Sequence, residues 1–370
     1  MAKKIAIVLQ TPRDPHSSVL LTYAALSAEL TRRGYTVTVF TPAEFPAARR
    51  FAGRLTPLVF PVAVAAWMRR QRDALNVVVF HSYAGWLAEA TGATGRAAVV
   101  VSFHGIEPMY HRALMTAASG RLSRRYRFLQ ERLMPMFLRT ACRRARRVTC
   151  LSREERRFLI ENGYAPDDRV VTVAHGVADR FFLAERAPRP VRTLLFVAQW
   201  LPMKGIDTLR AAFVELARRY ADLRLVCAGT LRSAADVTAA FPAGIRERVT
   251  VFPRVDGTHL TDIYRDADIF VFPSNYEGFG VAVLEAMAAA LPIVTTATGV
   301  AGDALADRES AMIVPPRDPA AIVRAVDALV SDDALRARVS AGARSAAETY
   351  RETARVREWA DALTAIDRVS

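Results

Sequence analysis

The sequence predicts two doubly wound α/β domains, and three observations lead to that prediction. Short β-branched apolar runs alternate with longer helical patterns along the 370 residues. Apolar strands separated by helices are typical of parallel sheets covered on both faces. About twelve such runs occur, which is too many for one ordinary open sheet. A proline-containing segment near residue 188, where the charge balance also changes, divides the two series.

The expected strands fall into two series of six. The first series is Ile5–Leu9, Thr36–Phe40, Val77–His81, Ala98–Phe103, Val148–Leu151 and Val170–Val173. The second series is Thr193–Val197, Leu223–Ala228, Val249–Phe252, Ile269–Phe272, Ile293–Thr295 and Met312–Val314. The helical patterns between them include Leu20–Arg33, Thr208–Tyr220, Val281–Ala290 and Pro319–Val330.

The domain boundary is expected in the segment Ala184–Val191. This segment contains two prolines and no apolar periodicity, which is typical of a linker. We therefore expect a first domain at 1–187, a second at 188–349, and a C-terminal helix at 350–370 that packs across both. Ligands bind beyond the carboxyl ends of strands in such sheets, so two facing sheets would hold one ligand in the cleft between them.

The charge is concentrated in the first half of the chain. Residues 1–190 hold 30 basic and 14 acidic side chains, whereas 191–370 hold 21 and 23. This asymmetry favours an anionic partner for the first half: nucleic acid, a membrane surface or an acidic acceptor. The alternative is compositional, because 48 of the 51 basic residues are arginine.

Composition excludes several classes of protein. With 52% apolar and 24% charged residues, the chain is not expected to be disordered. Three cysteines without C-x-x-C spacing argue against a disulfide framework or a zinc site and fit a reducing cytosol. The longest uncharged apolar stretch, Leu55–Met68, is too short to span a bilayer and contains two prolines. The N-terminus passes directly into a strand pattern, so we expect no secretory leader and a cytoplasmic protein.

The most informative stretch is Val271–Ala290, in which a buried strand, a glycine-containing turn and a helix follow one another. Glu277 lies in the turn, where a carboxylate is well placed to accept hydrogen bonds from sugar hydroxyls, and Glu285 lies eight residues later. The turn and helix start would offer backbone amides to an anion; the residues concerned are Gly278, Phe279, Gly280 and Val281. The alternative is a solvated loop acid followed by an ordinary helix-surface acid.

Two further residues are candidates for chemistry. Lys204 is one of three lysines among 51 basic residues, and the other two are at the extreme N-terminus. A lysine retained in an arginine-rich chain suggests a need for a compact point charge. His104 follows an expected strand and precedes a glycine, which places it at a carboxyl edge. The alternatives are an unselected surface lysine and a structural loop histidine.

Four motifs together resemble retaining glycosyltransferase family 4, which has the GT-B fold. Glu277 and Glu285 resemble the E-x7-E signature of that family. Phe196–Gly205 resembles its loop ending in P-x-K-G, Ser102–Pro108 its first-domain histidine loop, and Leu151–Phe182 its segment from a serine to N-G-V-D. The resemblance extends over nearly the whole chain and implies two Rossmann-like domains facing across a cleft.

The resemblance also implies roles for residues. Glu277 would hold hydroxyls of the donor sugar, and Glu285 would bind the nucleotide ribose. The amides of Phe279–Val281 and the charge of Lys204 would bind the donor phosphates, and His104 would lie near the reacting sugar. The nucleotide sugar would be a co-substrate, and neither a metal nor a resident cofactor is expected.

The sequence departs from the family pattern at several positions. Gln199 stands where the family usually has a phosphate-binding arginine, and Arg254 is a candidate substitute. The first loop lacks the usual glycine pair and instead offers His16, Ser17 and Ser18 as candidates for phosphate or acceptor binding. His175 stands where the family usually has asparagine, and we expect a structural role for it.

The pair Asp266 and Asp268 resembles the metal-binding D-x-D of other glycosyltransferases. It immediately precedes the expected strand Ile269–Phe272, so it belongs to the amino edge of the sheet, away from the ligand edge. We therefore expect no metal there.

The segment Gly120–Arg157 contains 13 arginines and three glutamates, with apolar residues at helical spacing and an interruption at Pro135. The apolar positions are Leu122, Tyr126, Leu129, Leu133 and Phe137. Such a segment can lie on an anionic membrane. In the alternative, the apolar stripe packs into the first domain and the arginines face solvent.

The hypothesis from the sequence is a retaining glycosyltransferase that moves a sugar from a nucleoside-diphosphate donor to a glycan, glycolipid or other hydroxyl acceptor. It would be cytoplasmic, held at the inner face of the membrane if the basic segment binds lipid, with no nucleic-acid partner. Two alternatives remain open: a non-catalytic protein that binds anionic surfaces, and a sugar-nucleotide epimerase with the same fold. A dinucleotide-dependent oxidoreductase is disfavoured because no G-x-G-x-x-G follows a first strand.

Overall fold

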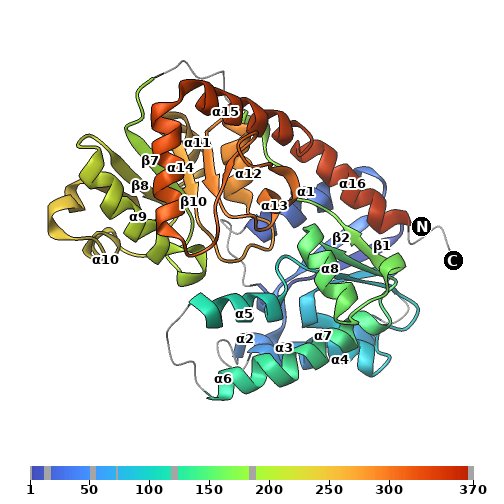
Figure 1. The fold of residues 1–370 in the computed structure, drawn as a ribbon. Coiled ribbons are helices and arrows are strands. Elements are labelled where there is room, and N and C mark those ends of the chain that lie inside the picture. The colour runs from blue at the N-terminus through green and yellow to red at the C-terminus, as the bar shows by residue number, and fades with distance from the viewer. Residues whose placement is uncertain are drawn as a thin grey trace. The chain divides into compact units, whose positions relative to one another are not determined.

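The computed structural model describes residues 2–11, 18–50, 56–71, 74–117, 124–182 and 189–365. These residues form two compact units, each built on a parallel sheet with helices on its faces (Figure 1). The first unit comprises residues 1–111, 122–175 and 353–370, and the second comprises 112–121 and 176–352. The predicted fold class, two doubly wound α/β domains, is confirmed.

The first unit contains a six-stranded parallel sheet in the order β2-β1-β3-β4-β5-β6. Its strands are β1 (Lys4–Val8), β2 (Thr36–Phe40), β3 (Val77–His81), β4 (Ala98–Ser102), β5 (Arg147–Cys150) and β6 (Val170–Thr172). The central strand β3 is buried along its whole length, as expected for a parallel sheet covered on both faces. Each strand ends within two residues of its predicted end.

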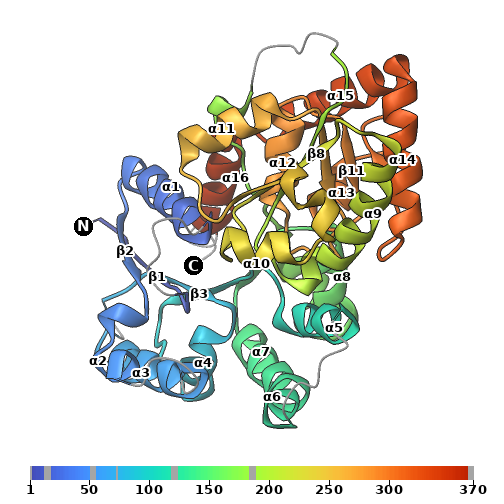
Figure 2. The ribbon, with the colours of Figure 1, turned by 90° about the vertical axis from the view of Figure 1, so that its left-hand side faces the viewer.

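The helices of the first unit cover both faces of this sheet. They are α1 (Ser18–Arg32), α2 (Pro46–Arg50), α3 (Thr56–Arg70), α4 (Trp86–Ala90), α5 (Glu107–Ala117), α6 (Arg124–Phe128), α7 (Met134–Arg143), α8 (Arg153–Glu161) and the C-terminal α16 (Glu352–Thr364). Both α1 and α16 lie side by side, whereas α3, α4 and α7 group together elsewhere in this unit (Figures 1 and 2).

The C-terminal helix α16 packs into the core of the first unit. Trp359, Ala360 and Leu363 are buried in one apolar cluster with residues of β1, β3 and α1. The Trp359 ring lies 5.1 Å from the Tyr23 ring, measured between centroids. The sequence predicted a C-terminal helix at 350–370 that packs across both domains, and the buried residues of α16 named here belong to the core of the first unit. The ends of the chain thus complete one core.

The second unit contains another six-stranded parallel sheet, in the order β12-β11-β10-β7-β8-β9. Its strands are β7 (Thr193–Val197), β8 (Arg224–Ala228), β9 (Val249–Phe252), β10 (Ile269–Phe272), β11 (Ile293–Thr295) and β12 (Met312–Ile313). Its helices are α9 (Ile206–Arg219), α10 (Ala234–Ala239), α11 (Gly257–Asp266), α12 (Val281–Ala288), α13 (Val300–Ala304), α14 (Pro319–Ser331) and α15 (Asp333–Glu348). Helices α9 and α14 lie side by side, as do α12 and α15 (Figures 1 and 2).

The division between the units falls at residue 176, earlier than the expected boundary at 187 and 188. Val177 pairs with Arg351 in an isolated β-bridge, and the Phe181 ring contacts the Tyr264 ring edge-on at 5.7 Å. These long-range contacts attach residues 176–182 to the second unit. No local pattern in the sequence predicts such contacts. Most of the expected linker lies outside the described residues, because residues 183–188 are not among them.

Of the apolar stripe expected in the basic segment, Phe137 is buried, Tyr126, Leu129 and Leu133 are half-buried, and Leu122 lies outside the described residues. In α7, Met134, Phe137 and Leu138 are buried, and the Phe137 ring stacks on Trp86 with centroids 4.4 Å apart. A π-helical turn, Leu129–Leu133, leads without a break from α6 into α7, and Pro135, which lacks an N–H, lies directly after this widened turn. Phe128 and Met136 remain exposed, at 58% and 50%. Within the described residues, no helix is both long and apolar enough to cross a bilayer.

Candidate functional site

The second sheet has a switch point between β7 and β10. β7 is its first strand along the chain, and the later strands β8 and β10 flank it on opposite sides. At such a point the loops that follow neighbouring strands diverge, which leaves a ligand crevice at the carboxyl edge. Lys204 lies in the loop after β7, and Glu277 lies in the loop after β10. The topology thus brings together two predicted site residues that are 73 positions apart.

Lys204 and Glu277 form a close ion pair. The Lys204 Nζ lies 2.7 Å from Glu277 Oε1 and 2.8 Å from Oε2. The Ser274 hydroxyl, fully buried, donates a further hydrogen bond of 2.7 Å to Oε1. The Lys204 side chain is 20% exposed and that of Glu277 7%. A cation and a carboxylate are therefore fixed together at the ligand edge, with the lysine accessible to solvent.

The lysine loop packs directly on the end of β10. Gly205 has a φ of +73°, and a Cβ built there would lie 1.9 Å from the Pro273 carbonyl oxygen. Only glycine permits both this backbone conformation and this approach. The Asn275 amide donates to the Met203 carbonyl at 2.8 Å. The two loops thus form one unit, which orients Lys204 before any ligand binds.

Helix α12 begins at Val281, four residues after Glu277. Gly280 caps it with a φ of +91°. The first amides of a helix have no intrahelical partner and carry partial positive charge, so this helix start suits an anion. The Phe279 side chain is buried, 6.2 Å from the Tyr350 ring, and its carbonyl accepts a hydrogen bond from the Val300 amide. Phe279 therefore anchors the turn through its side chain.

Glu285 lies in α12, close to the polar side chains of Tyr264 and Arg180. The sequence did not identify these neighbours. Burial raises the pKa of the Glu285 carboxyl to about 7, while the Tyr264 hydroxyl and the Arg180 guanidinium oppose that rise. The Tyr264 hydroxyl donates to Glu285 Oε2 at 2.9 Å. Ser274, Tyr264 and Arg180 carried no recognisable signal in the sequence, because each becomes relevant only through a long-range contact.

Gln199, at the position of the missing phosphate-binding arginine, and Arg254, its candidate substitute, are differently placed. Gln199 and Arg254 are both exposed. Gln199 follows β7, the strand that also leads to Lys204. Arg254 follows β9, which is separated from β7 by β8, so the sheet order does not bring Arg254 next to the ion pair. His16 and Ser17 lie outside the described residues, as does the side chain of Ser18.

The aspartates of the D-x-D sequence lie at the amino edge of the second sheet. Asp268 Oδ1 accepts a 2.5 Å hydrogen bond from Arg189, and Oδ2 accepts 2.9 Å bonds from the amides of Arg192 and Thr193. Asp268 therefore fastens the start of β7. Among the described residues, no group of three or more His, Cys, Asp or Glu side chains is arranged to hold a metal ion.

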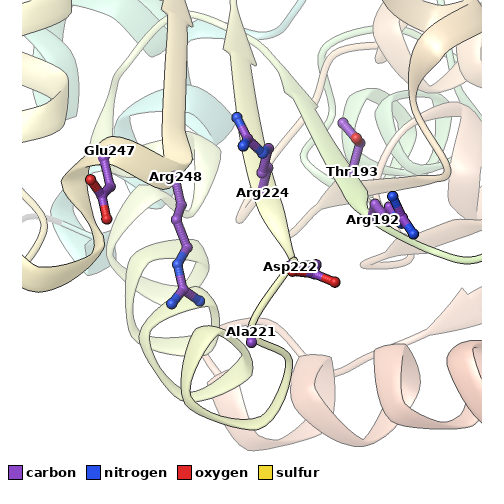
Figure 3. A pocket seen from close by; sticks show the side chains of 7 residues that line it. All are labelled: Arg192, Thr193, Ala221, Asp222, Arg224, Glu247 and Arg248. Atoms are coloured by element: carbon purple, nitrogen blue, oxygen red, sulfur yellow. The ribbon is translucent and has the colours of Figure 1, made fainter.

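A recess of about 630 Å³ opens at the amino ends of β7, β8 and β9 (Figure 3). Its charged lining includes Arg192, Arg224 and Arg248, whose guanidinium groups point in different directions in Figure 3. Arg248 donates to the carbonyls of Ala217 and Tyr220 at the end of α9. This recess lies at the edge opposite Lys204, and its arginines do not converge on one anion.

In the first unit, His104 follows β4 and belongs to a cluster of aromatic rings. His104 Nδ1 lies 3.2 Å from His175 Nε2, and His175 Nδ1 lies 3.0 Å from Thr22 Oγ1. The rings of Tyr23 and Trp359 lie 5.0 and 5.5 Å from that of His104. His175, for which the sequence predicted a structural role, thus directly contacts the predicted catalytic histidine.

Burial keeps the histidines of this cluster neutral. It lowers the pKa values of His81 and His175 to about 4, and it lowers the pKa of His104 well below its ordinary value. The neighbouring His175 and His81 add to the effect on His104. At neutral pH His104 is therefore a hydrogen-bonding group without charge.

Two family models match successive parts of the chain. Residues 22–181 match "Glycosyltransferase Family 4" and residues 179–346 match "Glycosyl transferases group 1". A D-inositol 3-phosphate glycosyltransferase from Xylanimonas cellulosilytica is 33% identical over 219 residues, covering 54% of this chain and 52% of that protein. The chain thus spans about half the length of the curated relatives it matches.

Solved structures share the fold at low sequence identity. The sucrose-phosphate synthase of Thermosynechococcus elongatus superposes with a TM-score of 0.79 at 17% identity, covering 100% of both chains. Anabaena HepE in complex with UDP-glucose superposes with a TM-score of 0.71 at 14% identity, covering 98% of this chain and 99% of that one. These likenesses show that the fold is GT-B.

We predict that replacing His175 by asparagine reduces the pH dependence of stability. The folded-state pKa of about 4 lies below the unfolded value of 6.5, so the unfolded chain gains the proton first as pH falls. This ring therefore lowers the free energy of unfolding by about 2 kcal/mol between pH 7.5 and pH 5.0. In chemical denaturation, the free energy of unfolding of His175→Asn should therefore fall by about 2 kcal/mol less than that of wild type over this pH range.

The matched control is His259→Asn, at an exposed histidine of the second unit. It should retain the wild-type pH dependence. If His175→Asn also retains it, His175 is not held neutral by burial.

Proposed function

Since the chain belongs to the family 4 glycosyltransferases with the GT-B fold, we propose that it transfers a sugar from a nucleoside-diphosphate donor to a hydroxyl of an acceptor. The Lys204–Glu277 ion pair at the switch point of the second sheet is the observation that carries the proposal. The pair combines a cation for phosphate with a carboxylate for sugar hydroxyls. The second unit then binds the donor, and the first unit binds the acceptor.

In this proposal the residues of the second unit divide the work on the donor. Lys204 and the first amides of α12 bind the diphosphate and stabilise its negative charge as it departs. Glu277 accepts hydrogen bonds from the donor sugar, and Glu285 accepts them from the ribose. Donor binding transfers Lys204 from Glu277 to the phosphates, which frees the carboxylate for the sugar.

His104 contributes hydrogen bonding near the reacting sugar, because burial keeps its ring neutral. The sugar is transferred with retention of configuration, as the family resemblance implies. The leaving diphosphate needs no metal in this proposal, since Lys204 and helix amides supply the positive charge. The Asp268 carboxylate is already occupied by Arg189 and two backbone amides.

We predict that Lys204→Ala and Glu277→Gln each lower turnover by at least about 100-fold while the protein remains folded. Both side chains lie at the ligand edge, and neither fills the apolar core. The assay measures release of nucleoside diphosphate and transfer of radiolabelled sugar, with UDP-, GDP- and ADP-glucose as donors and EDTA present. Glu247→Gln, in the recess at the opposite edge, is the control and should behave like wild type.

Near-normal turnover by either site variant would contradict the site assignment. An epimerised nucleotide sugar as the product would identify an epimerase instead. Activity that is lost in EDTA and restored by Mg²⁺ or Mn²⁺ would contradict the metal-independent mechanism.

We predict that donor affinity rises as the pH increases through about 7. Glu285 is mostly protonated below its pKa of about 7, and an ionised carboxylate accepts hydrogen bonds from ribose hydroxyls more strongly than a protonated one. Between pH 6 and pH 8 the Kd for the nucleotide sugar should fall by about fivefold. Calorimetric titration of wild type and Glu285→Gln decides the matter, because the variant should show a flat profile.

We further propose that the first unit binds an anionic membrane surface through α6 and α7. Phe128 and Met136 are exposed and stand among the exposed arginines Arg127, Arg132 and Arg139. Each arginine near an anionic bilayer contributes about 1 kcal/mol, and the two apolar side chains can insert between headgroups. The burial of Phe137 against Trp86 leaves these residues as the part of the segment available to lipid.

We expect binding to phosphatidylglycerol vesicles at low salt and little binding to phosphatidylcholine vesicles. High salt should release the protein, because the screening length is about 8 Å at physiological ionic strength. In co-sedimentation, the double variant Arg127→Glu/Phe128→Ser should lose binding to the anionic vesicles. The control Arg218→Glu, at a 74% exposed arginine of α9, should keep it. Protein that stays in the supernatant with anionic vesicles at low salt would contradict the proposal.

A further inference from the structure

The first sheet repeats the layout of the second. Its order places β1 between β2 and β3. The parallel strands are added first on one side of β1 and then on the other, so the switch point lies between β1 and β3. Gln10 lies just beyond β1, Ser82 follows β3 directly, and Glu107 begins α5 after β4. As in the second unit, side chains from loops beyond neighbouring strands meet at the carboxyl edge of the switch point, where ligands bind in sheets of this kind.

These three side chains form a hydrogen-bonded cluster. Glu107 Oε1 accepts 2.5 Å from the Ser82 hydroxyl and 2.8 Å from Gln10 Nε2. Because Gln10 uses its amide nitrogen on Glu107, its oxygen is an acceptor that points elsewhere. Gln10 Oε1 and Glu107 Oε2 are both shielded from solvent, and neither has a hydrogen-bond partner among the residues that the structure describes. The cluster therefore presents two hydrogen-bond acceptors that lack a donor.

The backbone is strained at the centre of this cluster. Ser82 is fully buried and has a φ of +52°, a conformation that costs a non-glycine residue roughly 1 kcal/mol or more. His81, immediately before it, is 8% exposed, and within the described part of the chain neither of its ring nitrogens has a hydrogen-bond partner. Unsatisfied buried polar atoms are rare in folded proteins, and here they gather at one edge together with backbone strain.

The charge of the cluster restricts what it can bind. Glu107 has no ion-pair partner among the described residues, and burial raises the pKa of its carboxyl. Its charge also helps to raise the pKa of the neighbouring Tyr83 hydroxyl. A phosphate at this position would oppose oxygen to oxygen, and no cation beside Glu107 among the described residues would offset its charge. A hydroxyl or an ammonium group would supply the missing donors.

We propose that Gln10, Ser82 and Glu107 form an acceptor subsite that binds a hydrogen-bond-donating group, a hydroxyl or an ammonium, and excludes phosphate. The proposal rests on the function proposed above and specifies its acceptor as a neutral or amino-bearing sugar or polyol. It separates this chain from the relatives named for D-inositol 3-phosphate, whose named acceptor carries a phosphate.

The test compares three hexoses that differ in one group: glucose, glucosamine and glucose 6-phosphate. Binding to the full chain is measured by ligand-observed NMR, without donor. Wild type should bind glucose or glucosamine, and glucose 6-phosphate about tenfold more weakly. In Glu107→Gln this preference should shrink by about tenfold, because the variant keeps the shape of the side chain and removes its charge. A glucosamine signal well above that of glucose identifies the group as an ammonium; the reverse identifies a hydroxyl.

Ser82→Gly is the second variant. Glycine adopts a φ of +52° without strain, so thermal stability should be retained or increased, while hexose binding weakens because the hydroxyl is absent. Glu131→Gln, at a 55% exposed carboxylate, is the control and should match wild type.

The subsite is overturned if glucose 6-phosphate binds wild type as well as the other hexoses, if Glu107→Gln leaves the preference unchanged, or if neither glucose nor glucosamine binds. Titration of the same variants with UDP, GDP and ADP keeps this result separate from the proposed function. Nucleotide binding depends on the second unit and should be unaffected by both first-unit variants.

Discussion

The contact between Lys204 and Glu277 links the loops after β7 and β10, the two strands at the switch point of the second sheet. It closes the switch point of the second sheet, where the loops after β7 and β10 meet, with both carboxylate oxygens within 2.8 Å of the lysine nitrogen. The surrounding residues maintain this contact: Gly205 permits the close approach of the loops, and Ser274 fixes the carboxylate. The two charges satisfy each other within the protein, and under the proposed function the phosphates and sugar hydroxyls of the donor replace this pair.

The first unit uses the same topology with the opposite chemistry. Its switch point presents carboxylate and amide oxygens through Glu107 and Gln10, where the second unit presents a cation and helix amides. The neutral rings of His104 and His175 lie at the carboxyl edge of the same sheet. Under the proposed function this difference would separate the two substrates, because a diphosphate suits the edge with the cation and a hydrogen-bond donor suits the edge with the oxygens.

Sequence reasoning recovered what local chemistry determines and missed what depends on distant contacts. The strand ends and the bounds of the few helices named from the sequence followed from apolar runs and turn residues, and motifs at the ends of strands pointed to Lys204 and Glu277. The role of Arg254 as a substitute for the missing phosphate-binding arginine stays a prediction, and strand order, which places β8 between β7 and β9, is not visible in the sequence. The earlier unit boundary rests on the pairing of Val177 with Arg351, and the supporting roles of Tyr264 and His175 likewise require the fold.

The account is tested most directly by the affinity of nucleoside diphosphates, without sugar, for wild type, Lys204→Ala, Glu277→Ala and the double variant. UDP, GDP and ADP are titrated calorimetrically, and the tightest is carried through the series. If the phosphates take Lys204 from Glu277, Lys204→Ala should weaken binding, whereas Glu277→Ala should preserve or tighten it, and the double variant should resemble Lys204→Ala. Equal affinities for all four proteins, or weaker binding by Glu277→Ala alone, would contradict a donor site built on this ion pair.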